Sequence, residues 1–158
     1  MATSLKNLNI YSGLENIDFS KVKVGIAISE YNEDITGSLY KAAVETLTNE
    51  GVKEENIITK YVPGAYELTL GAQHMAMDNS IDAVICIGCV IQGETKHFDF
   101  ICSAIAHGIT DVSLKYNKPV AFGVLTPNDQ QQALDRAGGK HGNKGVEAAV
   151  AVLKMLSF

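Results

Sequence analysis

The stretch Lys21-Val-Lys-Val-Gly-Ile-Ala-Ile-Ser29 first alternates polar and apolar residues and then becomes continuously apolar. A continuous apolar run is typical of a parallel strand that is covered on both faces, so we predict a buried strand here. From Ile35 onward, apolar residues recur at helical spacing. Acidic Glu33 and Asp34 fall in the first turn and Gly51 follows the last, which are start and stop signals of a helix. The stretch therefore predicts a strand followed by a crossover helix.

The same strand-and-helix unit recurs three more times along the chain. The further predicted strands are Ile57–Val62, Ala83–Ile91 and Val120–Leu125, and the further predicted helices include Tyr66–Asp78, Phe98–Asn117 and Val146–Leu156. Another helix is predicted directly after the last strand, with Thr126 as its N-cap, Pro127 in its first position and Asp129 reaching back from the third. Gly138 and Gly139 are predicted to end it.

This alternation predicts the fold class. The chain has no break in composition and no low-complexity linker, so we expect one three-layer α/β domain. Its expected form is a flavodoxin-like fold with a four-stranded parallel sheet flanked by helices. We assign residues 22–158 to this domain, and residues 1–21, which are polar and weakly patterned, to an N-terminal segment.

Composition and charge exclude several classes of protein. Of the 158 residues, 46% are hydrophobic and 20% charged, as in average globular domains and unlike disordered or collagen-like chains. The net charge is −5 and positive charge is not clustered, so we expect no nucleic acid as a partner. The longest apolar run, Ala83–Ile91, is too short to span a bilayer, and the start of the chain lacks the pattern of a secretory signal. We expect no membrane partner and a cytoplasmic location.

The three cysteines do not predict a disulfide framework or a metal site. Cys86 and Cys89 form a C-x-x-C pattern, but in a strand a separation of three places their side chains on opposite faces. No second pair or nearby histidine completes a zinc site. We therefore interpret these residues, together with Cys102, as buried thiols that act as small apolar side chains.

The loops after the strands are where an open parallel sheet binds its ligand. Tyr31 and Tyr66 lie in such loops and can stack on a flat heterocycle, or can simply plug the end of the sheet. Gly93-Glu94-Thr95 precedes a helix and can offer backbone N–H groups to a phosphate, or can serve only to cap that helix. The glycines of this loop have P-loop spacing, but Glu94 replaces the essential lysine, which argues against a nucleoside triphosphate.

Charged residues near these loops suggest acid–base and anion chemistry. His97 stands at the start of a predicted helix, and a histidine can transfer protons near neutral pH. The other three histidines have no partner at metal-ligand spacing, so we interpret them as solvated or packed. Arg136, Lys140 and Lys144 form a basic cluster that can bind an anion or can be a solvated surface. Physical reasoning alone thus predicts an α/β domain that binds a small phosphorylated or aromatic ligand.

Three separated motifs carry a more specific signal. They are Val62-Pro-Gly-Ala-Tyr-Glu67, Ile87-Gly-Cys-Val-Ile-Gln-Gly-Glu-Thr-Lys-His-Phe-Asp-Phe100 and Arg136-Ala-Gly-Gly-Lys-His-Gly-Asn-Lys-Gly145. In this order they strongly resemble the lumazine synthase family, in register from about Val22 to Leu156. The resemblance implies condensation of 5-amino-6-(D-ribitylamino)uracil with 3,4-dihydroxy-2-butanone 4-phosphate. The products would be 6,7-dimethyl-8-ribityllumazine, phosphate and water, in the penultimate step of riboflavin biosynthesis and without a cofactor.

The resemblance also implies a role for individual residues, His97 being the catalytic one through proton transfer. Tyr31 stands where the family has an aromatic side chain that stacks on the uracil ring, although the usual residue there is Phe or Trp, and Asn32 lies beside it. The residues implied for the ribityl chain are Ala65, Tyr66 and Glu67, and those for the pyrimidine edge are Cys89, Val90 and Ile91. Those implied for the phosphate are Gly93, Glu94, Thr95 and Arg136. The set implied to come from the adjacent subunit is Phe122, Arg136 and Lys144.

The resemblance further implies a homopentamer whose sites lie between neighbouring subunits. The short break between the last two predicted helices favours pentamers that close into an icosahedral 60-mer, with riboflavin synthase as a further possible partner. Two alternatives have different chemistry: a lumazine-synthase-like riboflavin synthase, and a non-catalytic flavin- or lumazine-binding shell protein. His97, Arg136 and Lys144 favour the synthase over both.

Overall fold

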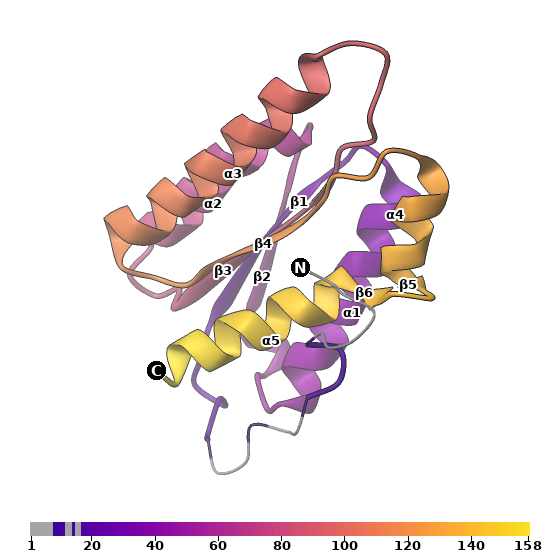
Figure 1. The fold of residues 1–158 in the computed structure, drawn as a ribbon. Coiled ribbons are helices and arrows are strands. Elements are labelled where there is room, and N and C mark those ends of the chain that lie inside the picture. Colours follow the sequence, from indigo (N-terminus) through magenta and orange to yellow (C-terminus); the bar gives the residue numbers. More distant parts are fainter. Residues whose placement is uncertain (1–7, 12–13, 15–16) are drawn as a thin grey trace.

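The computed structural model describes residues 8–11, 14 and 17–158. Within this part of the chain the sheet is parallel and has the order β2-β1-β3-β4, as predicted for a flavodoxin-like fold (Figure 1). Its strands are β1 (Val24–Ser29), β2 (Ile57–Val62), β3 (Ala83–Cys89) and β4 (Val120–Leu125). The α-helices are α1 (Glu33–Asn49), α2 (Leu68–Met77), α3 (His97–Tyr116), α4 (Gln130–Arg136) and α5 (Lys144–Leu156). Short 3-10 turns η1 (Glu54–Asn56) and η2 (Ala65–Glu67) and a hairpin of β5 (Ala137–Gly139) and β6 (Gly142–Asn143) complete the elements.

Two cores lie on the two faces of the sheet. Helices α1 and α5 cover one face, and α2 and α3 cover the other (Figure 1). All six residues of β1 are buried, with Ile26 and Ile28 in the α1/α5 core and Ala27 in the α2/α3 core. Full burial of an isoleucine contributes about 1.5–3 kcal/mol relative to exposure. The prediction of a strand buried on both faces is therefore confirmed.

The cysteines also follow the prediction in part. Cys86 packs in the α2/α3 core and Cys89 in the α1/α5 core, so the two thiols do lie on opposite faces of β3. Burial raises the pKa of Cys86 to about 12 and that of Cys89 to about 11, so both remain protonated at neutral pH. Cys102, in contrast, is only half-buried on α3. Among the described residues, no group of three or more His, Cys, Asp or Glu side chains could hold a metal ion.

The start predicted for the fourth helix is wrong. Thr126 is not the N-cap, because α4 begins only at Gln130 and is capped by Asp129, whose carboxylate accepts from the Gln132 N–H at 2.8 Å. The physical reason is that Pro127 belongs to an extended segment: its carbonyl accepts a hydrogen bond at 2.9 Å from the loop after β3. Asp129 thus points forward into the helix rather than back to Thr126.

Other element ends differ by smaller amounts. The strand predicted to reach Ile91 ends at Cys89, and the helix predicted from Tyr66 begins with the 3-10 turn η2. The glycine-rich break before α5 forms the β5–β6 hairpin, which we did not predict. In the described part of the chain, no helix is long and apolar enough to cross a membrane.

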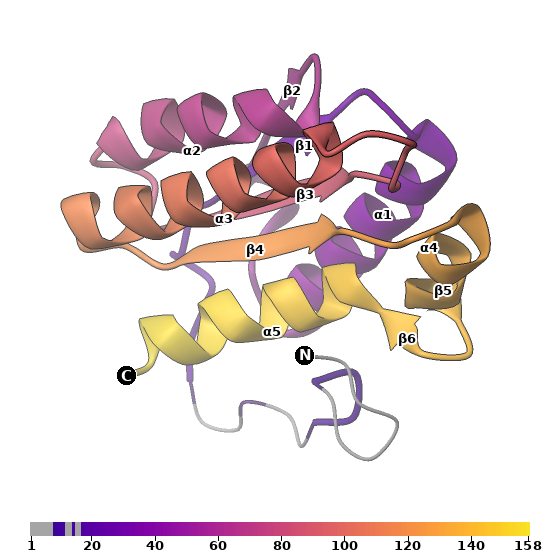
Figure 2. The same cartoon turned by 45° about the horizontal axis from the view of Figure 1, so that its top comes forward.

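The sheet topology brings the functional loops together. Because all four strands are parallel, the loops that follow them emerge at one edge of the sheet. The chain turns toward β2 after β1 and toward β4 after β3, so the switch point lies between β1 and β3. In Figure 2, two segments lie at the same end of the sheet, beyond the arrowhead of β4. One is the loop that precedes α3, and the other is α4 with the β5–β6 hairpin that follows it.

Candidate active site

Hydrogen bonds fasten the four loops at the carboxyl edge to one another. The bonds are Glu30 N–H to Val62 O (3.0 Å), Asn32 Nδ2 to Cys89 O (2.9 Å), Val90 N–H to Leu125 O (2.8 Å) and Gln92 N–H to Pro127 O (2.9 Å). Each joins a loop to that of the neighbouring strand, so the loops form one connected platform. A platform of this kind can hold side chains in fixed positions toward a ligand.

The two tyrosines lie on this platform with accessible rings. Tyr31 is 70% exposed and Tyr66 is 57% exposed, so neither plugs the end of the sheet. Asn32 turns the chain next to Tyr31 in the left-handed conformation (φ 59°, ψ 49°), which asparagine tolerates better than most residues. The Tyr31 ring lies against Gly64, where an added Cβ would come within 3.2 Å of its Cδ2 atom. One face of a planar ligand could therefore stack on these rings.

The residues expected around the ribityl chain and the pyrimidine form the floor of the platform. Ala65 is buried, and the Glu67 carboxylate accepts from the Gly64 N–H at 3.0 Å. Cys89 is buried as well, and Val90 and Ile91 are half-buried. The floor is thus mostly apolar, with its polar groups at the rim.

Ser29 places an unusual group just below this floor. Its side chain is 1% exposed, and its hydroxyl has no hydrogen-bond partner among the described residues. The hydroxyl faces the backbone of Gly88, where an added Cβ would lie 3.3 Å away. A buried hydroxyl without a partner is costly.

The loop before α3 offers backbone donors. In the part of the chain that the structure describes, the N–H groups of Gly93, Glu94 and Thr95 have no hydrogen-bond partner, and all three residues are exposed. An added Cβ on Gly93 would meet no atom within 4 Å, so space is open there. His97 begins α3 with an exposed side chain, and its N–H donates to Thr95 Oγ1 at 3.4 Å. The loop can bind an anion beside the imidazole.

A second group of expected site residues lies apart from the platform. Phe122, Arg136 and Lys144 line one cavity of about 520 Å³ between β4, α4 and α5, which we call the cationic cavity. Leu125 and Pro127 of the platform also line it, but none of the platform side chains expected to bind substrate does. The structure therefore brings the expected residues together in two sets on two parts of the chain.

The charges of the basic cluster are unequal. Lys144 Nζ pairs with Glu147 at 2.9 Å, and Lys140 Nζ pairs with Asp135 at 2.9 Å. The hydrogen bond from Lys140 is the largest of the effects that hold the pKa of Asp135 below its ordinary value. Arg136 donates from Nη1 to a backbone carbonyl at 3.3 Å and has no carboxylate partner among the described residues. In this cluster, the two lysine charges are thus each paired with a carboxylate of the described residues, whereas the Arg136 guanidinium is not.

Two residues of the cationic cavity were missed in the sequence. His141 was interpreted as solvated or packed, yet it is half-buried and lines the cavity. Its place between Arg136 and Lys144 in the third motif was the available signal. Glu147 also lines the cavity, and its spacing of three from Lys144 on one helix predicts the observed pair.

Comparisons with known proteins show which family the sequence matches. The sequence model of the 6,7-dimethyl-8-ribityllumazine synthase family matches residues 21–158. A relative from Cytophaga hutchinsonii is 59% identical over 99% of this chain and 98% of its own length. A relative from Parabacteroides distasonis is 48% identical over 100% of this chain and 99% of its own length. A relative from Porphyromonas gingivalis is 49% identical over 98% of this chain and 96% of its own length. Each of the three relatives is named 6,7-dimethyl-8-ribityllumazine synthase.

Proposed function

The chain belongs to the 6,7-dimethyl-8-ribityllumazine synthase family, and from this premise we propose how its residues divide the work of the reaction. It is an enzyme of riboflavin biosynthesis, a transferase. It condenses 5-amino-6-(D-ribitylamino)uracil with 3,4-dihydroxy-2-butanone 4-phosphate to 6,7-dimethyl-8-ribityllumazine, phosphate and water.

The observation that carries the division of roles is that the expected substrate-binding side chains of the platform do not line the cationic cavity, although Leu125 and Pro127 belong to both. The platform offers rings for stacking and an imidazole, whereas the cavity offers a guanidinium and an ammonium. A phosphorylated substrate needs both kinds of group at once. The site is therefore completed between two copies of the chain, with Phe122, Arg136 and Lys144 coming from the neighbour.

In the proposed site, Tyr31 stacks on the uracil ring and Asn32 stands beside it. The ribityl chain contacts Ala65, Tyr66 and Glu67, and the pyrimidine edge contacts Cys89, Val90 and Ile91. The N–H groups of Gly93, Glu94 and Thr95 hold the phosphate from one side, and Arg136 holds it from the other. Lys144 adds a second positive charge, and Phe122 covers the pyrimidine.

The chemistry proceeds through an imine. The 5-amino nitrogen attacks the ketone carbonyl, and water leaves. His97 then takes a carbon-bound proton while the carbon–oxygen bond to phosphate breaks, which gives an enol. The enol becomes a ketone, and the ribitylamino nitrogen attacks it to close the ring with loss of a second water. Arg136 and the N–H groups of the loop stabilise the departing phosphate dianion.

Much of the rate comes from holding the two substrates in contact. Stacking fixes the diamine and the guanidinium fixes the phosphate, so an encounter of two molecules becomes a local event. No metal or cofactor enters these steps. A single proton acceptor, His97, suffices for the transfer that accompanies loss of phosphate.

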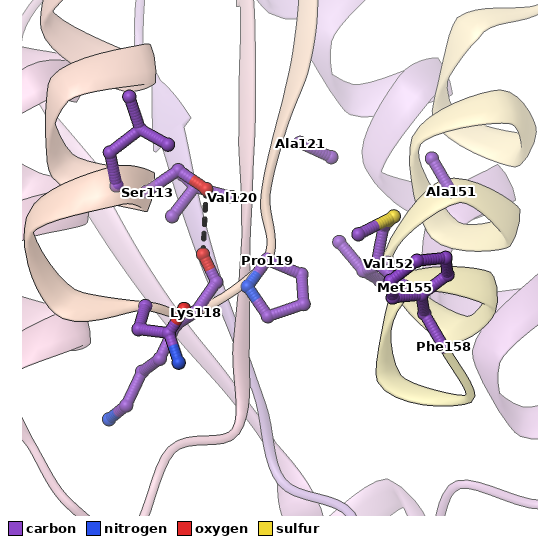
Figure 3. Close-up of a pocket in the computed structure, with 11 residues that line it drawn as sticks. Ser113, Lys118, Pro119, Val120, Ala121, Ala151, Val152, Met155 and Phe158 are labelled. Atoms are coloured by element: carbon purple, nitrogen blue, oxygen red, sulfur yellow. Dashed lines mark hydrogen bonds between the residues drawn. The ribbon is translucent and has the colours of Figure 1, made fainter.

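The edge of the sheet supports assembly into a homopentamer. A hollow of about 480 Å³ runs along β4 between the C-terminal ends of α3 and α5, lined by apolar side chains such as Val120, Val152 and Met155 (Figure 3). Phe158 lines it too, with a fully exposed side chain. We expect a neighbouring copy to cover this edge, and pentamers to close into an icosahedral 60-mer. Light scattering should give a particle far larger than a pentamer. A mass equal to that of a pentamer would contradict the 60-mer but not the proposed reaction.

The remaining parts of the proposal concern context. We place the enzyme in the cytoplasm and take riboflavin synthase, which would consume the lumazine, as a partner. We also retain residues 1–21 as a segment distinct from the domain at 22–158.

The test is to mix the purified chain with both substrates and follow lumazine fluorescence. A rate well above the uncatalysed condensation is expected. A rate equal to it would favour a non-catalytic lumazine carrier, and riboflavin formed from added lumazine would favour a riboflavin synthase. Replacement of His97 by Gln should lower kcat with little change in the KM of either substrate.

A further inference from the structure

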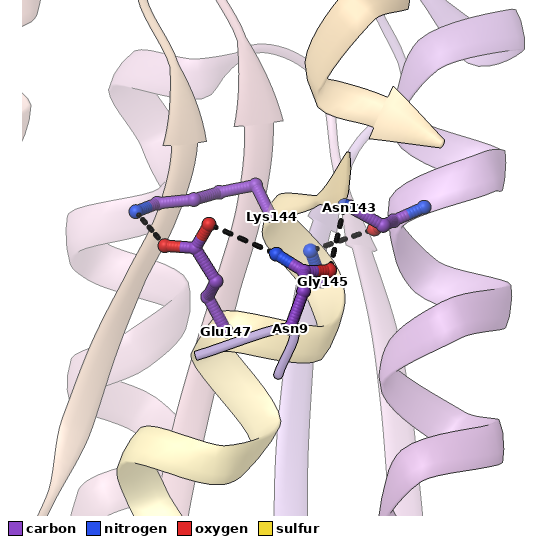
Figure 4. A network of polar contacts seen from close by, with 5 residues as sticks. All are labelled: Asn9, Asn143, Lys144, Gly145 and Glu147. Carbon is purple, nitrogen blue, oxygen red and sulfur yellow. Dashed lines mark hydrogen bonds and ion pairs between the residues drawn. The ribbon is translucent and has the colours of Figure 1, made fainter. Parts of the chain in front are cut away.

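Among the described residues of the N-terminal segment, Asn9 contacts Glu147, which lines the cationic cavity. The Asn9 Oδ1 accepts from the Asn143 N–H at 2.8 Å, and its Nδ2 donates to Glu147 Oε1 at 3.1 Å. The other oxygen of Glu147 accepts from Lys144 Nζ at 2.9 Å. Figure 4 shows these groups in one line, from the segment to the ammonium group. This series of hydrogen bonds links Asn9, which lies outside the family match that begins at residue 21, to Lys144, a cation of the cavity.

The contact of Asn9 is built into the hairpin before α5. Gly142 has φ +79°, and a Cβ added there would come within 2.7 Å of the Asn9 amide. Glycine is the residue that both fits this backbone conformation and leaves room for the amide. The next residue, Asn143, is the N-cap of α5, and its Oδ1 accepts from the Gly145 N–H at 2.8 Å. Asn9 is therefore held by the residue that starts the helix carrying Lys144.

Burial makes this connection matter for charge. The Glu147 side chain is 9% exposed and the Lys144 side chain 23%, so little water reaches the pair. A carboxylate with so little water needs donors for both oxygens. The Asn9 amide donates to one oxygen of Glu147, so the Lys144 ammonium group bonds only to the other oxygen. Without that amide, both oxygens of Glu147 would compete for the N–H groups of Lys144 and draw them away from the cavity.

We propose that Asn9 is a positioning residue that fixes Lys144 through Glu147 and so sets the affinity of the cationic cavity for the phosphorylated substrate. The inference rests on the proposed function of this cavity and goes beyond it by giving the N-terminal segment a part in substrate binding. Asn9 itself touches no reacting atom; it acts through the carboxylate.

The structure supplies a matched control in the same segment. Tyr11 donates from its hydroxyl to Glu50 Oε1 at 2.8 Å, at the end of α1 and away from the cavity. Tyr11→Phe removes one side-chain hydrogen bond of the segment and leaves Glu147 untouched, whereas Asn9→Ala removes the two of Asn9 named above, one of them to Glu147. If the segment acted only as a general tether, the two variants would behave alike.

The experiment measures KM for each substrate, kcat, and inhibition by inorganic phosphate, in the full-length chain. Asn9→Ala should raise KM for the phosphorylated ketone and the inhibition constant of phosphate about three- to tenfold, the net size of the lost hydrogen bond to Glu147. Asn9→Asp, which places a second carboxylate beside Glu147, should raise both at least as much. KM for the diaminouracil should change by less than about twofold, as should every parameter of Tyr11→Phe. In a Glu147→Gln background, Asn9→Asp should have almost no effect, because the pair can form its hydrogen bond with donor and acceptor exchanged.

Three results would overturn the inference: equal effects of the Asn9 and Tyr11 variants, equal rises in both KM values, or an undiminished effect of Asn9→Asp beside Gln at position 147. Failure of the proposed function is a separate outcome, since wild-type chain would then form no lumazine at all. If the wild type were active and the Asn9 variants had its KM values and its inhibition constant for phosphate, only the positioning role would be refuted.

Discussion

Replacing Arg136 by Ala should impair use of the phosphorylated ketone far more than use of the diaminouracil. The reason is the distribution of charge in the cationic cavity. Lys144 and Lys140 each have a carboxylate partner at 2.9 Å, whereas Arg136 has none among the residues that the structure describes. A phosphate that enters the cavity therefore meets one cation whose charge is not already compensated.

The expected magnitude follows from the donors of Arg136. A guanidinium has five N–H groups, and one of those on Arg136 is engaged by the Gln132 carbonyl at 3.3 Å. The others can form two parallel bonds to a phosphate. Since a hydrogen bond to a charged group contributes about 1.5–3 kcal/mol, we expect the loss of two to cost about 3–6 kcal/mol, or about 150- to 25,000-fold in kcat/KM. Arg136→Lys keeps the charge but not the fork, and should lose about tenfold.

The assay varies the ketone phosphate at a saturating concentration of diaminouracil, and then the reverse, with lumazine fluorescence as the signal. Lys140→Ala is the matched control, because it removes a positive charge of the same hairpin that already pairs with Asp135. Lys140 is exposed and its charge is already paired, so its loss should change kcat/KM by about twofold or less. If Lys140→Ala matched Arg136→Ala, or if Arg136→Ala raised both KM values equally, the reasoning would be wrong.

Three further predictions concern stability, measured as thermal or urea unfolding at one protein concentration. Gly145→Ala places a Cβ against the Leu39 carbonyl and should cost about 3 kcal/mol, or about 6–12 °C, whereas Gly37→Ala in open space on α1 should not destabilise. Ser29→Ala removes a buried hydroxyl that has no partner among the described residues, and should be neutral or stabilising by about 1 kcal/mol; a clear loss of stability would reveal a bound water or other partner. The lowered pKa of Asp135 means that its contribution is present above about pH 4 and is lost as the pH falls further, so Asp135→Asn should flatten the acid limb of a stability–pH curve.

The fold was predictable because its two central strands, β1 and β3, are buried on both faces. A parallel strand under two layers of helices must be apolar throughout. The edge strands Ile57–Val62 and Val120–Leu125 are less buried, but they also have the predicted bounds. The start of α4 was not predictable from local signals. Thr126 and Pro127 form a good helix start in isolation, but the Pro127 carbonyl bonds to Gln92, thirty-five residues earlier in the sequence. Such a long-range contact outweighs a local capping preference.

The platform of the candidate site was also predictable, because loops after parallel strands must share one edge. The cationic cavity was harder to foresee. Arg136, Lys140 and Lys144 could be recognised as a cluster, but only the folded hairpin brings Lys140 to Asp135 and leaves Arg136 without a carboxylate partner among the described residues. For the same reason His141 was missed: a half-buried position is a property of packing and not of spacing.

Charge compensation in the cavity also bears on turnover. Phosphate is a product of the reaction as well as part of a substrate, so a cavity with several uncompensated cations would hold the product as firmly as the substrate. Binding that is equal in the ground state and the transition state does not raise kcat. Pairing Lys144 with Glu147 limits the positive charge, while Arg136 remains available for the dianion as it departs. Removing the negative charge of Glu147 should accordingly tighten inhibition by inorganic phosphate without raising kcat, and a Glu147→Gln variant that bound phosphate more weakly would contradict this account.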